Sequence, residues 1–434
     1  MHKKRSHSKR TAAVFLITLG GVILLGLIAI GIMRLVQGRT SAANKEYAGA
    51  SSDSDDFLKK ETIPETASSF SDTSGNNDSA SADALLDEEV LSRYGGILSS
   101  AERMEEERIY TREAASEDVI TLAFTGDILF DDEYSMMASL INRGGELNTS
   151  MGQSLLDLMN SVDIMVVNNE FPYTERGTKT ENKDYNFRAD LDTVKYLDDM
   201  GADVAILANN HVLDYGQEGL NDTLDVLKEN GIASVGAGRN IEEASHPIYF
   251  IVNDTKIAIV AATQIERLDN PPTVSATENS GGTFRCWTGD LIYEKIREAK
   301  ENADFVIVCV HWGTEKETSP DSYQLAQGPK MAEAGADVII GDHPHVLQGI
   351  TYFGDTPCIY SLGNFWFNSS TIDTGIVELE IADNELKSFR FIPCLQSGNV
   401  TRLTEGEDSE RILNSMREMS SGVTIDDNGY VYKK

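Results

Sequence analysis

The chain has 434 residues, and its 70 acidic side chains outnumber its 37 basic ones, which gives a formal net charge of −33. This acidic balance argues against binding to nucleic acid and against attachment to anionic lipid or an anionic polymer by charge attraction alone. The length exceeds what one hydrophobic core usually holds, so we expect a main domain of roughly 250 to 300 residues with extensions.

The N-terminus has the pattern of a membrane anchor. Residues 1–11 carry five basic side chains and form a predicted cytoplasmic arm, and no charged residue lies between Ala12 and Met33. At about 1.5 Å per helical residue this stretch can span a hydrocarbon core of about 30 Å, so we predict a transmembrane helix over residues 12–36. The basic arm places the main domain outside the cell. A cleaved signal peptide is the alternative, although its apolar segment is normally shorter.

The segments on either side of the main domain carry no catalytic motif. Residues 37–117 begin with a stretch rich in Ser, Ala, Asp and Asn, which is typical of disorder, and continue with apolar residues among Glu and Arg, which favour one or two helices. We therefore predict an extracellular stalk that is disordered to partly helical. Residues 401–434 are predicted to be a C-terminal extension with a short amphipathic helix and a strand.

The main domain is predicted over residues 118–400 and has an α/β pattern. Helical patterns end at Gly201 and Gly335, and an apolar run follows each glycine almost at once. Such short connections are typical of βα units on a largely parallel sheet. Further apolar segments at 248–261 and 376–381 predict additional strands. Two facing sheets with helices outside would accommodate all of these elements.

Five polar blocks directly follow apolar runs, and they contain four of the seven histidines. The blocks are Gly126-Asp127, Asn169-Glu170, Asn210-His211, His311-Trp312-Gly313 and Asp342-His343-Pro344-His345. Apolar runs without alternation are typical of buried parallel strands, and ligands in open α/β sheets bind outside the carboxyl ends of such strands. Since Asp, Glu, Asn and His supply the donors that divalent metals accept from proteins, the sequence predicts a metal-assisted hydrolytic site.

Several of these donors also have a purely structural interpretation. Asp127 could cap a helix, and His311 could be a core histidine with satisfied hydrogen bonds. Glu170 is harder to explain in this way, because a buried carboxylate without a partner is costly and favours a cation nearby. The pair His343 and His345 is the least readily explained by structure alone.

The four cysteines lack the spacing of a metal site. Cys309 lies within an apolar run and is predicted to be a buried thiol. Outside the cell a disulfide could form among Cys286, Cys358 and Cys394, but the sequence does not determine a pairing.

Six blocks, taken in order, resemble the bacterial CapA family of capsule and poly-γ-glutamate synthesis proteins. They are Gly126-Asp127, Asn169 to Pro172, Asn209 to Gly216, His311 to Glu315, Gly341 to Val346 and Tyr360 to Phe365. The resemblance covers about residues 118–396. The family is similar to calcineurin-like metallophosphoesterases, which implies a four-layer α/β/β/α sandwich. It also implies membrane-bound capsule synthase components as partners and an anionic polymer or a phosphoester as the substrate.

The same resemblance implies a role for each donor. Asp127 and His345 would bind a first metal, and Glu170 would bridge it to a second metal. The second metal would also be bound by Asn210, His311 and His343. His211 matches a general acid that protonates the leaving group. Contacts with the substrate or with the ligands are expected from Asn169, Asp214, Trp312, Glu315, Asp342 and Asn364. Trp312 and Phe365 could instead pack in the core, which is the favoured interpretation of both.

Two positions depart from the phosphoesterase pattern. Leu129 stands where a metal-binding histidine is usual, and Glu170 stands where aspartate is usual. The missing histidine removes a ligand from the first metal, unless Asp131 or Asp132 replaces it. We therefore expect one tightly bound divalent ion, Mn²⁺, Zn²⁺ or Fe²⁺, and a second that binds weakly.

Three functions agree with this sequence. The favoured one is a membrane-anchored, metal-dependent phosphoesterase-like hydrolase in capsule or poly-γ-glutamate synthesis. The second is a non-catalytic subunit that binds polymer or supports an export complex, and the third is a general extracellular phosphodiesterase. The chain has no nucleotide-binding glycine loop of the P-loop type, so the ligation chemistry of polymer synthesis is expected to belong to another protein.

Overall fold

The computed structural model describes residues 88–265 and 275–434. The predicted basic arm, the transmembrane helix over residues 12–36 and most of the stalk lie outside the described residues. Within the described ranges, every helix is too short or too polar to cross a membrane.

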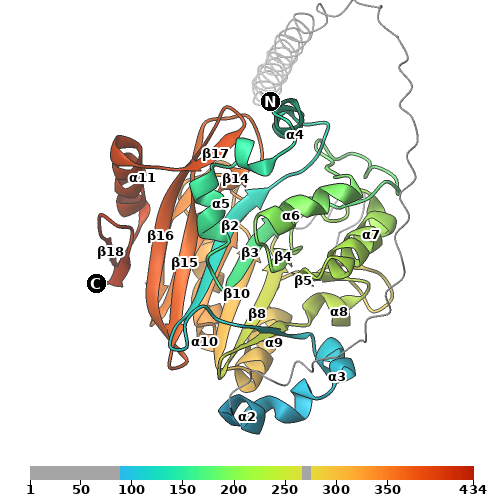
Figure 1. Ribbon diagram of the computed structural model, residues 1–434, viewed down its shortest axis with the longest axis vertical. Helices are drawn as coiled ribbons and strands as arrows, with labels where there is room; N and C mark the ends of the chain where they lie inside the picture. The colour runs from blue at the N-terminus through green and yellow to red at the C-terminus, as the bar shows by residue number, and fades with distance from the viewer. Residues whose placement is uncertain (1–87, 266–274) are drawn as a thin grey trace, which may run out of the picture. The chain divides into compact units, whose positions relative to one another are not determined.

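One sheet of the described chain combines a parallel half with an antiparallel half (Figure 1). In spatial order its strands are β17 (Val400–Leu403), β16 (Glu385–Ser397), β15 (Ile372–Ala382), β2 (Ile120–Ile128), β3 (Ile164–Asn169), β4 (Val204–Ile206) and β5 (Ala233–Val235), and β14 (Asn364–Trp366) pairs with the end of β2. The strands from β2 to β5 run parallel. The strands β15 and β16 extend the sheet in antiparallel fashion on the other side of β2.

The second large sheet has a parallel centre flanked by hairpins. Its spatial order is β1 (Ile109–Arg112), β7 (Ile248–Val252), β8 (Thr255–Thr263), β10 (Phe305–His311), β11 (Val338–Asp342), β13 (Thr356–Leu362) and β12 (Leu347–Phe353). The strands β8, β10, β11 and β13 are parallel. Two small antiparallel pairs are also present, β6 (Ala237–Gly238) with β9 (Gly282–Thr283) and β18 (Val423–Ile425) with β19 (Val431–Lys433).

Helices cover the outer faces of both sheets (Figure 1). Those on the outer face of the β2 sheet are α4 (Ser135–Asn142), α5 (Gln153–Met159), α6 (Lys195–Asp199) and α7 (Gly216–Glu229), with the 3₁₀ turns η2 (Leu147–Thr149) and η3 (Leu191–Val194). Those on the outer face of the β10 sheet include α2 (Glu88–Leu98), α8 (Ile241–Ser245), α9 (Asp290–Asn302) and α10 (Ser322–Ala334). The helix α3 (Ala101–Glu106) follows α2, and α11 (Gly406–Met419) packs beside β12 and β16.

Three hydrophobic cores separate these layers. The middle core joins the two sheets, since it contains Phe124 of β2 and Ile307 of β10. Neighbouring residues on the same strands point the other way: Ala123 lies in the core under α4 to α7, and Val308 lies in the core under α9 and α10. Because these strands bury both faces, their sequences read as continuous apolar runs. The order of layers is the α/β/β/α order expected from the sequence.

Two boundaries differ from those expected. The strand β1 lies within the predicted stalk, yet it pairs with β7 in register from Ile109 to Arg112, so the folded body begins before residue 118. The predicted C-terminal extension is also part of the fold, because Ile412 and Met416 of α11 lie in the core between the sheets. The amphipathic helix predicted in the extension is present as α11, but its own sequence does not show what it packs against, and an edge strand such as β1 likewise takes its position from the strand beside it.

All four cysteines are buried and free, so no disulfide links them. The prediction of a buried thiol at Cys309 is confirmed, because this side chain lies in the core between the sheets. Burial also raises the pKa of Cys286 to about 12, so its thiol stays protonated at neutral pH.

Candidate metal centre

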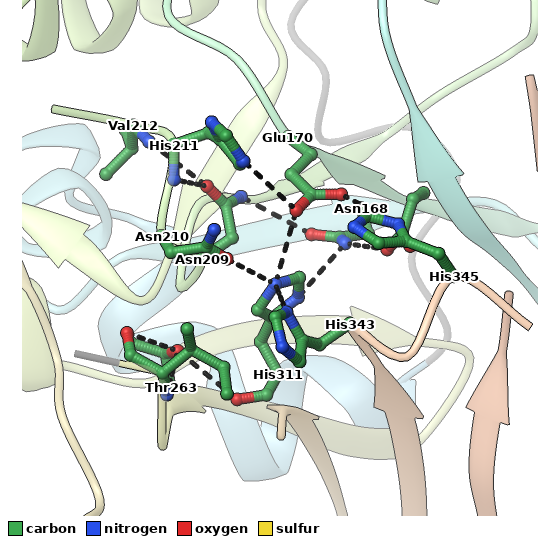
Figure 2. Close-up of polar contacts among 12 residues, drawn as sticks. Asn168, Glu170, Asn209, Asn210, His211, Val212, Thr263, His311, His343 and His345 are labelled. Atoms are coloured by element: carbon green, nitrogen blue, oxygen red, sulfur yellow. Dashed lines mark hydrogen bonds and ion pairs between the residues drawn. The ribbon is translucent and has the colours of Figure 1, made fainter. Parts of the chain in front are cut away.

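The polar blocks come together where strands of both sheets end (Figure 2). Asp127 lies in β2, and Glu170 directly follows β3, which is its neighbour in the same sheet. His311 is the last residue of β10 in the facing sheet, and His343 directly follows β11. The candidate site is therefore built from the carboxyl ends of two sheets rather than from the edge of one sheet.

Glu170 stands at the middle of this arrangement. Its Oε1 atom lies 3.4 Å from His311 Nε2 and 3.9 Å from His211 Nε2, and its Oε2 atom lies 4.0 Å from His345 Nδ1. The side chain is fully buried, and neither carboxylate oxygen has a hydrogen-bond partner. Burial and the nearby carboxylate of Asp127 raise the pKa of Glu170 above its usual range. A buried carboxylate without hydrogen-bond partners is costly and favours a cation beside it.

The first group of donors surrounds His345. Asp127 Oδ2 lies 2.9 Å from His345 Nδ1, although this oxygen is not in hydrogen-bonding geometry. Asp127 Oδ1 accepts a 2.6 Å hydrogen bond from Asn168 Nδ2, and Asn364 Oδ1 lies 2.8 Å from His345 Nδ1. Burial alone would lower the pKa of His345, but the carboxylates of Glu170 and Asp127 outweigh it and raise the pKa to about 10. Without a metal, a proton on His345 thus balances part of this negative charge.

The second group of donors contains two histidines. His311 Nε2 lies 2.9 Å from Asn210 Oδ1 and 3.1 Å from His343 Nδ1. Burial lowers the pKa of His311 to about 3, and burial together with the neighbouring histidines lowers the pKa of His343 as well. Both rings are therefore neutral at physiological pH, which is the form that binds metals.

These two groups fit a pair of divalent ions. The donor atoms of Asp127, Glu170 and His345 all lie within 4.8 Å of one another, and so do those of Glu170, His311 and His343. Glu170 belongs to both groups, which is the position of a carboxylate that bridges two cations about 3.5 to 4 Å apart. Carboxylate and imidazole donors with unpartnered buried oxygens are what such ions require.

The backbone at the two histidines of the last block is unusual. His343 has a φ of 100° and His345 a φ of 58°, in the left-handed region that residues other than glycine rarely adopt. Strain of this kind costs on the order of 1 to 3 kcal/mol per residue and tends to occur at functional sites. The turn at Pro344 thus holds both rings toward the centre at an energetic cost, with their centroids 5.8 Å apart.

His211 lies beside the donors and is held from its other side. Its Nδ1 atom is 2.6 Å from Asp214 Oδ2, and its ring lies against Phe187 with centroids 4.2 Å apart. This leaves Nε2 directed toward Glu170 (Figure 2). Burial lowers the pKa of His211, and the charge of Lys183 adds to that effect, while Asp214 opposes it. The geometry agrees with a group that exchanges a proton beside the metal donors rather than one that binds a metal.

Three supporting residues were missed by the sequence analysis. Lys183 is about nine-tenths buried, and its ammonium group donates to the carboxylate of Asp214 and to the backbone carbonyl of Asn210. Asn168 donates to Asp127, and the side chain of Asn209 accepts 3.1 Å hydrogen bonds from two backbone amides of the Asn210–Val212 turn. Only Asn209 stood inside a recognisable block, whereas Lys183 is an isolated basic residue in a loop.

The remaining predicted residues occupy different places. Asn169 donates to the Phe171 carbonyl at 2.7 Å and has an unpartnered Oδ1, and Asp342 is buried with an unpartnered Oδ1 and a pKa raised by burial and by nearby carboxylates. Trp312 is fully buried, and its Nε1 donates to the Tyr360 carbonyl at 2.9 Å, so it packs in the core and does not line a substrate pocket.

Phe365 is fully buried as well, as the core interpretation expected. Glu315 is exposed, and its charge reaches the centre only as a field that raises the pKa of His311. The carboxylate of Asp131 already accepts hydrogen bonds from the backbone amides of Glu133 and Arg188, both at 2.9 Å. The Asp131 carboxylate is therefore held by these backbone amides, and it does not replace the metal-binding side chain that is missing at position 129.

The fold and this centre define a four-layer α/β protein with paired groups of metal donors at the ends of two facing sheets. The chain belongs to the family described as bacterial capsule synthesis protein PGA_cap, whose family model matches residues 121–369. It is 32% identical over 283 residues to PGA biosynthesis protein CapA of Bacillus subtilis (strain 168), and the match covers 64% of this chain and 72% of that protein. It is 29% identical over 313 residues to capsule biosynthesis protein CapA of Bacillus anthracis, and this match covers 70% of this chain and 74% of that protein.

A solved structure of a hypothetical protein from Thermus thermophilus is similar at a TM-score of 0.39 and 13% identity, over 64% of this chain and 100% of that chain. This likeness is too distant to bear on function.

Proposed function

We propose that this protein is a metal-dependent phosphoesterase-like hydrolase that acts in capsule or poly-γ-glutamate synthesis. The observation that carries the proposal is the fully buried carboxylate of Glu170, which has no hydrogen-bond partner and is shared by two groups of donors. A bound pair of divalent ions would activate water and neutralise charge on a phosphoryl oxygen. The names of the Bacillus relatives support the biological role.

The residues of this chain divide the remaining work. His211 presents Nε2 toward the centre, where it can give a proton to a leaving oxygen. Asp214 holds the other ring nitrogen, and Lys183 fixes Asp214 in turn. The face of Phe187 restricts the ring to one orientation. Together these contacts hold the His211 imidazole in one orientation beside the metal donors, where it can transfer a proton.

Metal-dependent hydrolysis by the full-length chain in detergent tests this proposal. The protein is first loaded with Mn²⁺ or Zn²⁺ and its metal content is measured. The same sample is then assayed on bis-p-nitrophenyl phosphate and on poly-γ-glutamate. We expect phosphodiester cleavage that a chelator abolishes and added metal restores. A folded, metal-loaded protein that leaves both compounds intact would contradict the enzymatic role.

A non-catalytic subunit of a capsule synthase complex is the second candidate. One observation that favours it is Leu129, which occupies a ligand position of the phosphoesterase pattern and whose side chain is buried in the core under α4 to α7. In addition, the candidate imidazoles are shielded from solvent: even His345, the most exposed of them, has only 17% of its side chain accessible. In a non-catalytic subunit, metal would be required for folding or for polymer binding, but the protein would not hydrolyse phosphoesters. A general extracellular phosphodiesterase is less favoured, because the relatives are named for capsule synthesis.

We further propose that residues 12–36 anchor the protein in the cell membrane, with the main domain outside and membrane-bound synthase components as partners. The five early basic residues and the uncharged stretch after them support this arrangement. A reporter enzyme fused after Lys434 should be active only outside the cell. Cytoplasmic activity, or a soluble mature protein lacking residues 1–40, would contradict it.

A further inference from the structure

The short strand β14 brings an amide side chain to the first group of donors. It runs parallel to β2, and Asn364 lies opposite Asp127 in the register. The two backbones are very close, because a Cβ atom on Gly126 would lie 1.9 Å from the Gly363 carbonyl oxygen. That same oxygen accepts a 3.0 Å hydrogen bond from the Asp127 amide. Glycine at position 126 therefore allows an approach that aligns the side chains of Asp127 and Asn364.

Oxygens from three residues surround one nitrogen of His345. Asn364 Oδ1 lies 2.8 Å from His345 Nδ1, Asp127 Oδ2 lies 2.9 Å from it, and Glu170 Oε2 lies 4.0 Å from it. Asn364 itself is only 1% exposed. Around a six-coordinate ion with bonds of about 2.1 Å, adjacent ligand atoms lie about 3 Å apart. The distances from His345 Nδ1 to Asn364 and Asp127 are therefore close to those between adjacent ligands on a common ion, and the 4.0 Å to Glu170 is close to the distance of about 4.2 Å between opposite ligands.

We propose that Asn364 Oδ1 is a direct ligand of the first metal and takes the place of the histidine that Leu129 cannot supply. The inference rests on the metal centre of the proposed function, but it does not require that the centre be catalytic. It would make the first site rich in oxygen, with Asp127, Glu170 and Asn364 joined by one imidazole. Oxygen donors of this kind suit Mn²⁺, whereas the paired imidazoles of His311 and His343 suit Zn²⁺ or Fe²⁺. Two well-bound ions follow, rather than one tight and one weak ion.

Binding of Mn²⁺ to the full-length chain in detergent tests this role. We expect the wild-type protein to bind two Mn²⁺ ions and to give the electron paramagnetic resonance signal of an exchange-coupled pair. Asn364→Leu should bind one equivalent fewer, and the pair signal should not return at saturating Mn²⁺. Asn364→Asp, which keeps an oxygen at the same place, should retain both ions. Asn302→Ala, an exposed position on α9, serves as the matched control.

A purely supporting role for Asn364 gives a different result. If Asn364 only accepts a hydrogen bond from His345, Asn364→Leu should still bind two Mn²⁺ ions, and the pair signal should return unchanged at high Mn²⁺. That outcome would overturn the inference. Loss of one bound ion from a folded Asn364→Leu protein, with no return of the pair signal at saturating Mn²⁺, would support it. Failure of the wild-type protein to hydrolyse phosphodiesters would contradict the proposed function alone, since the metal measurements do not depend on activity.

Discussion

The two sides of Glu170 differ in the chemistry of their donors, although they share that one carboxylate. On one side, Asp127 and His345 form a group to which Asn364 adds another oxygen. On the other side, His311 and His343 contribute two imidazoles. The oxygen donors come mainly from the β2 sheet, whereas both imidazoles come from the ends of β10 and β11 in the facing sheet. Each sheet thus supplies mainly one type of ligand, and the two sides differ in how many of each type they receive, since His345 on the oxygen side also follows β11.

Replacing Glu170 by Gln should have the largest effect, because this side chain alone belongs to both sides. We expect both ions to be lost and hydrolysis to fall to background. A ligand at 100 times its dissociation constant stabilises the native state by about 2.7 kcal/mol, so the gain in melting temperature on adding metal should also disappear. Metal analysis and thermal melting with and without Mn²⁺ measure these effects.

The metal-free Glu170→Gln protein should be at least as stable as wild type. The pKa of Glu170 is raised in the folded state, so above the usual value of 4.5 the unfolded chain releases a proton that the folded chain retains. Stability of the wild-type protein therefore falls as the pH rises from 4.5 toward the raised pKa, and glutamine removes this loss. The advantage of the variant should be larger at about pH 7 than at about pH 5. A metal-free variant that melts well below wild type at neutral pH would show that Glu170 has a structural role instead.

Single histidine variants separate the two sides. His343→Ala should lose the ion on the imidazole side, and His345→Ala should lose the ion on the oxygen side, while each retains the other ion at reduced affinity. The double variant should bind neither and should melt several degrees below wild type when metal is present. Equilibrium dialysis followed by metal analysis gives the number of bound ions. Unchanged metal content and melting temperature in the double variant would show that these residues do not form a metal site.

The sequence predicted the sheets better than it predicted the surroundings of the centre. Long apolar runs such as Phe305 to Val310 indicate strands reliably, because burial on both faces leaves no alternative to apolar residues. The polar blocks after those runs predicted which donors come together. The sequence did not show that two sheets would supply them, nor that Lys183 would reach Asp214 from a loop 31 residues earlier. Such contacts depend on the path of the chain in space, which local patterns do not encode.

His211→Ala should reduce hydrolysis while leaving both sides of the centre occupied. Its ring nitrogen Nδ1 is held by Asp214, and its Nε2 lies 3.9 Å from Glu170, so the side chain faces the centre without belonging to either group of donors. General acid catalysis is typically worth about 10² to 10⁴ in rate, and we expect a loss of kcat in that range. Full activity in a folded, metal-loaded His211→Ala protein would favour the non-catalytic subunit.

Lys183→Met should have the smallest effect of these substitutions. We expect that effect on the imidazole side of the centre. The ammonium group of Lys183 supports Asp214, which orients His211, and it also holds the backbone carbonyl of Asn210, whose side chain lies 2.9 Å from His311. Methionine keeps most of the length and apolar volume of the side chain but removes the charge and the donors. We expect kcat to fall about tenfold, at the low end of the range for residues that orient metal ligands, because Asp214 still contacts His211 directly.

The ion on the oxygen side should remain bound in Lys183→Met, since neither Asp214 nor Asn210, which Lys183 contacts, belongs to the group of donors on that side. Lys179→Met is the matched control, because Lys179 lies in the same loop but is about half exposed and pairs only loosely with Glu133 at 3.9 Å. Steady-state kinetics and metal analysis of both variants measure the change in kcat and the number of bound ions. Equal rates for Lys183→Met, Lys179→Met and wild type would show that Lys183 only neutralises buried charge.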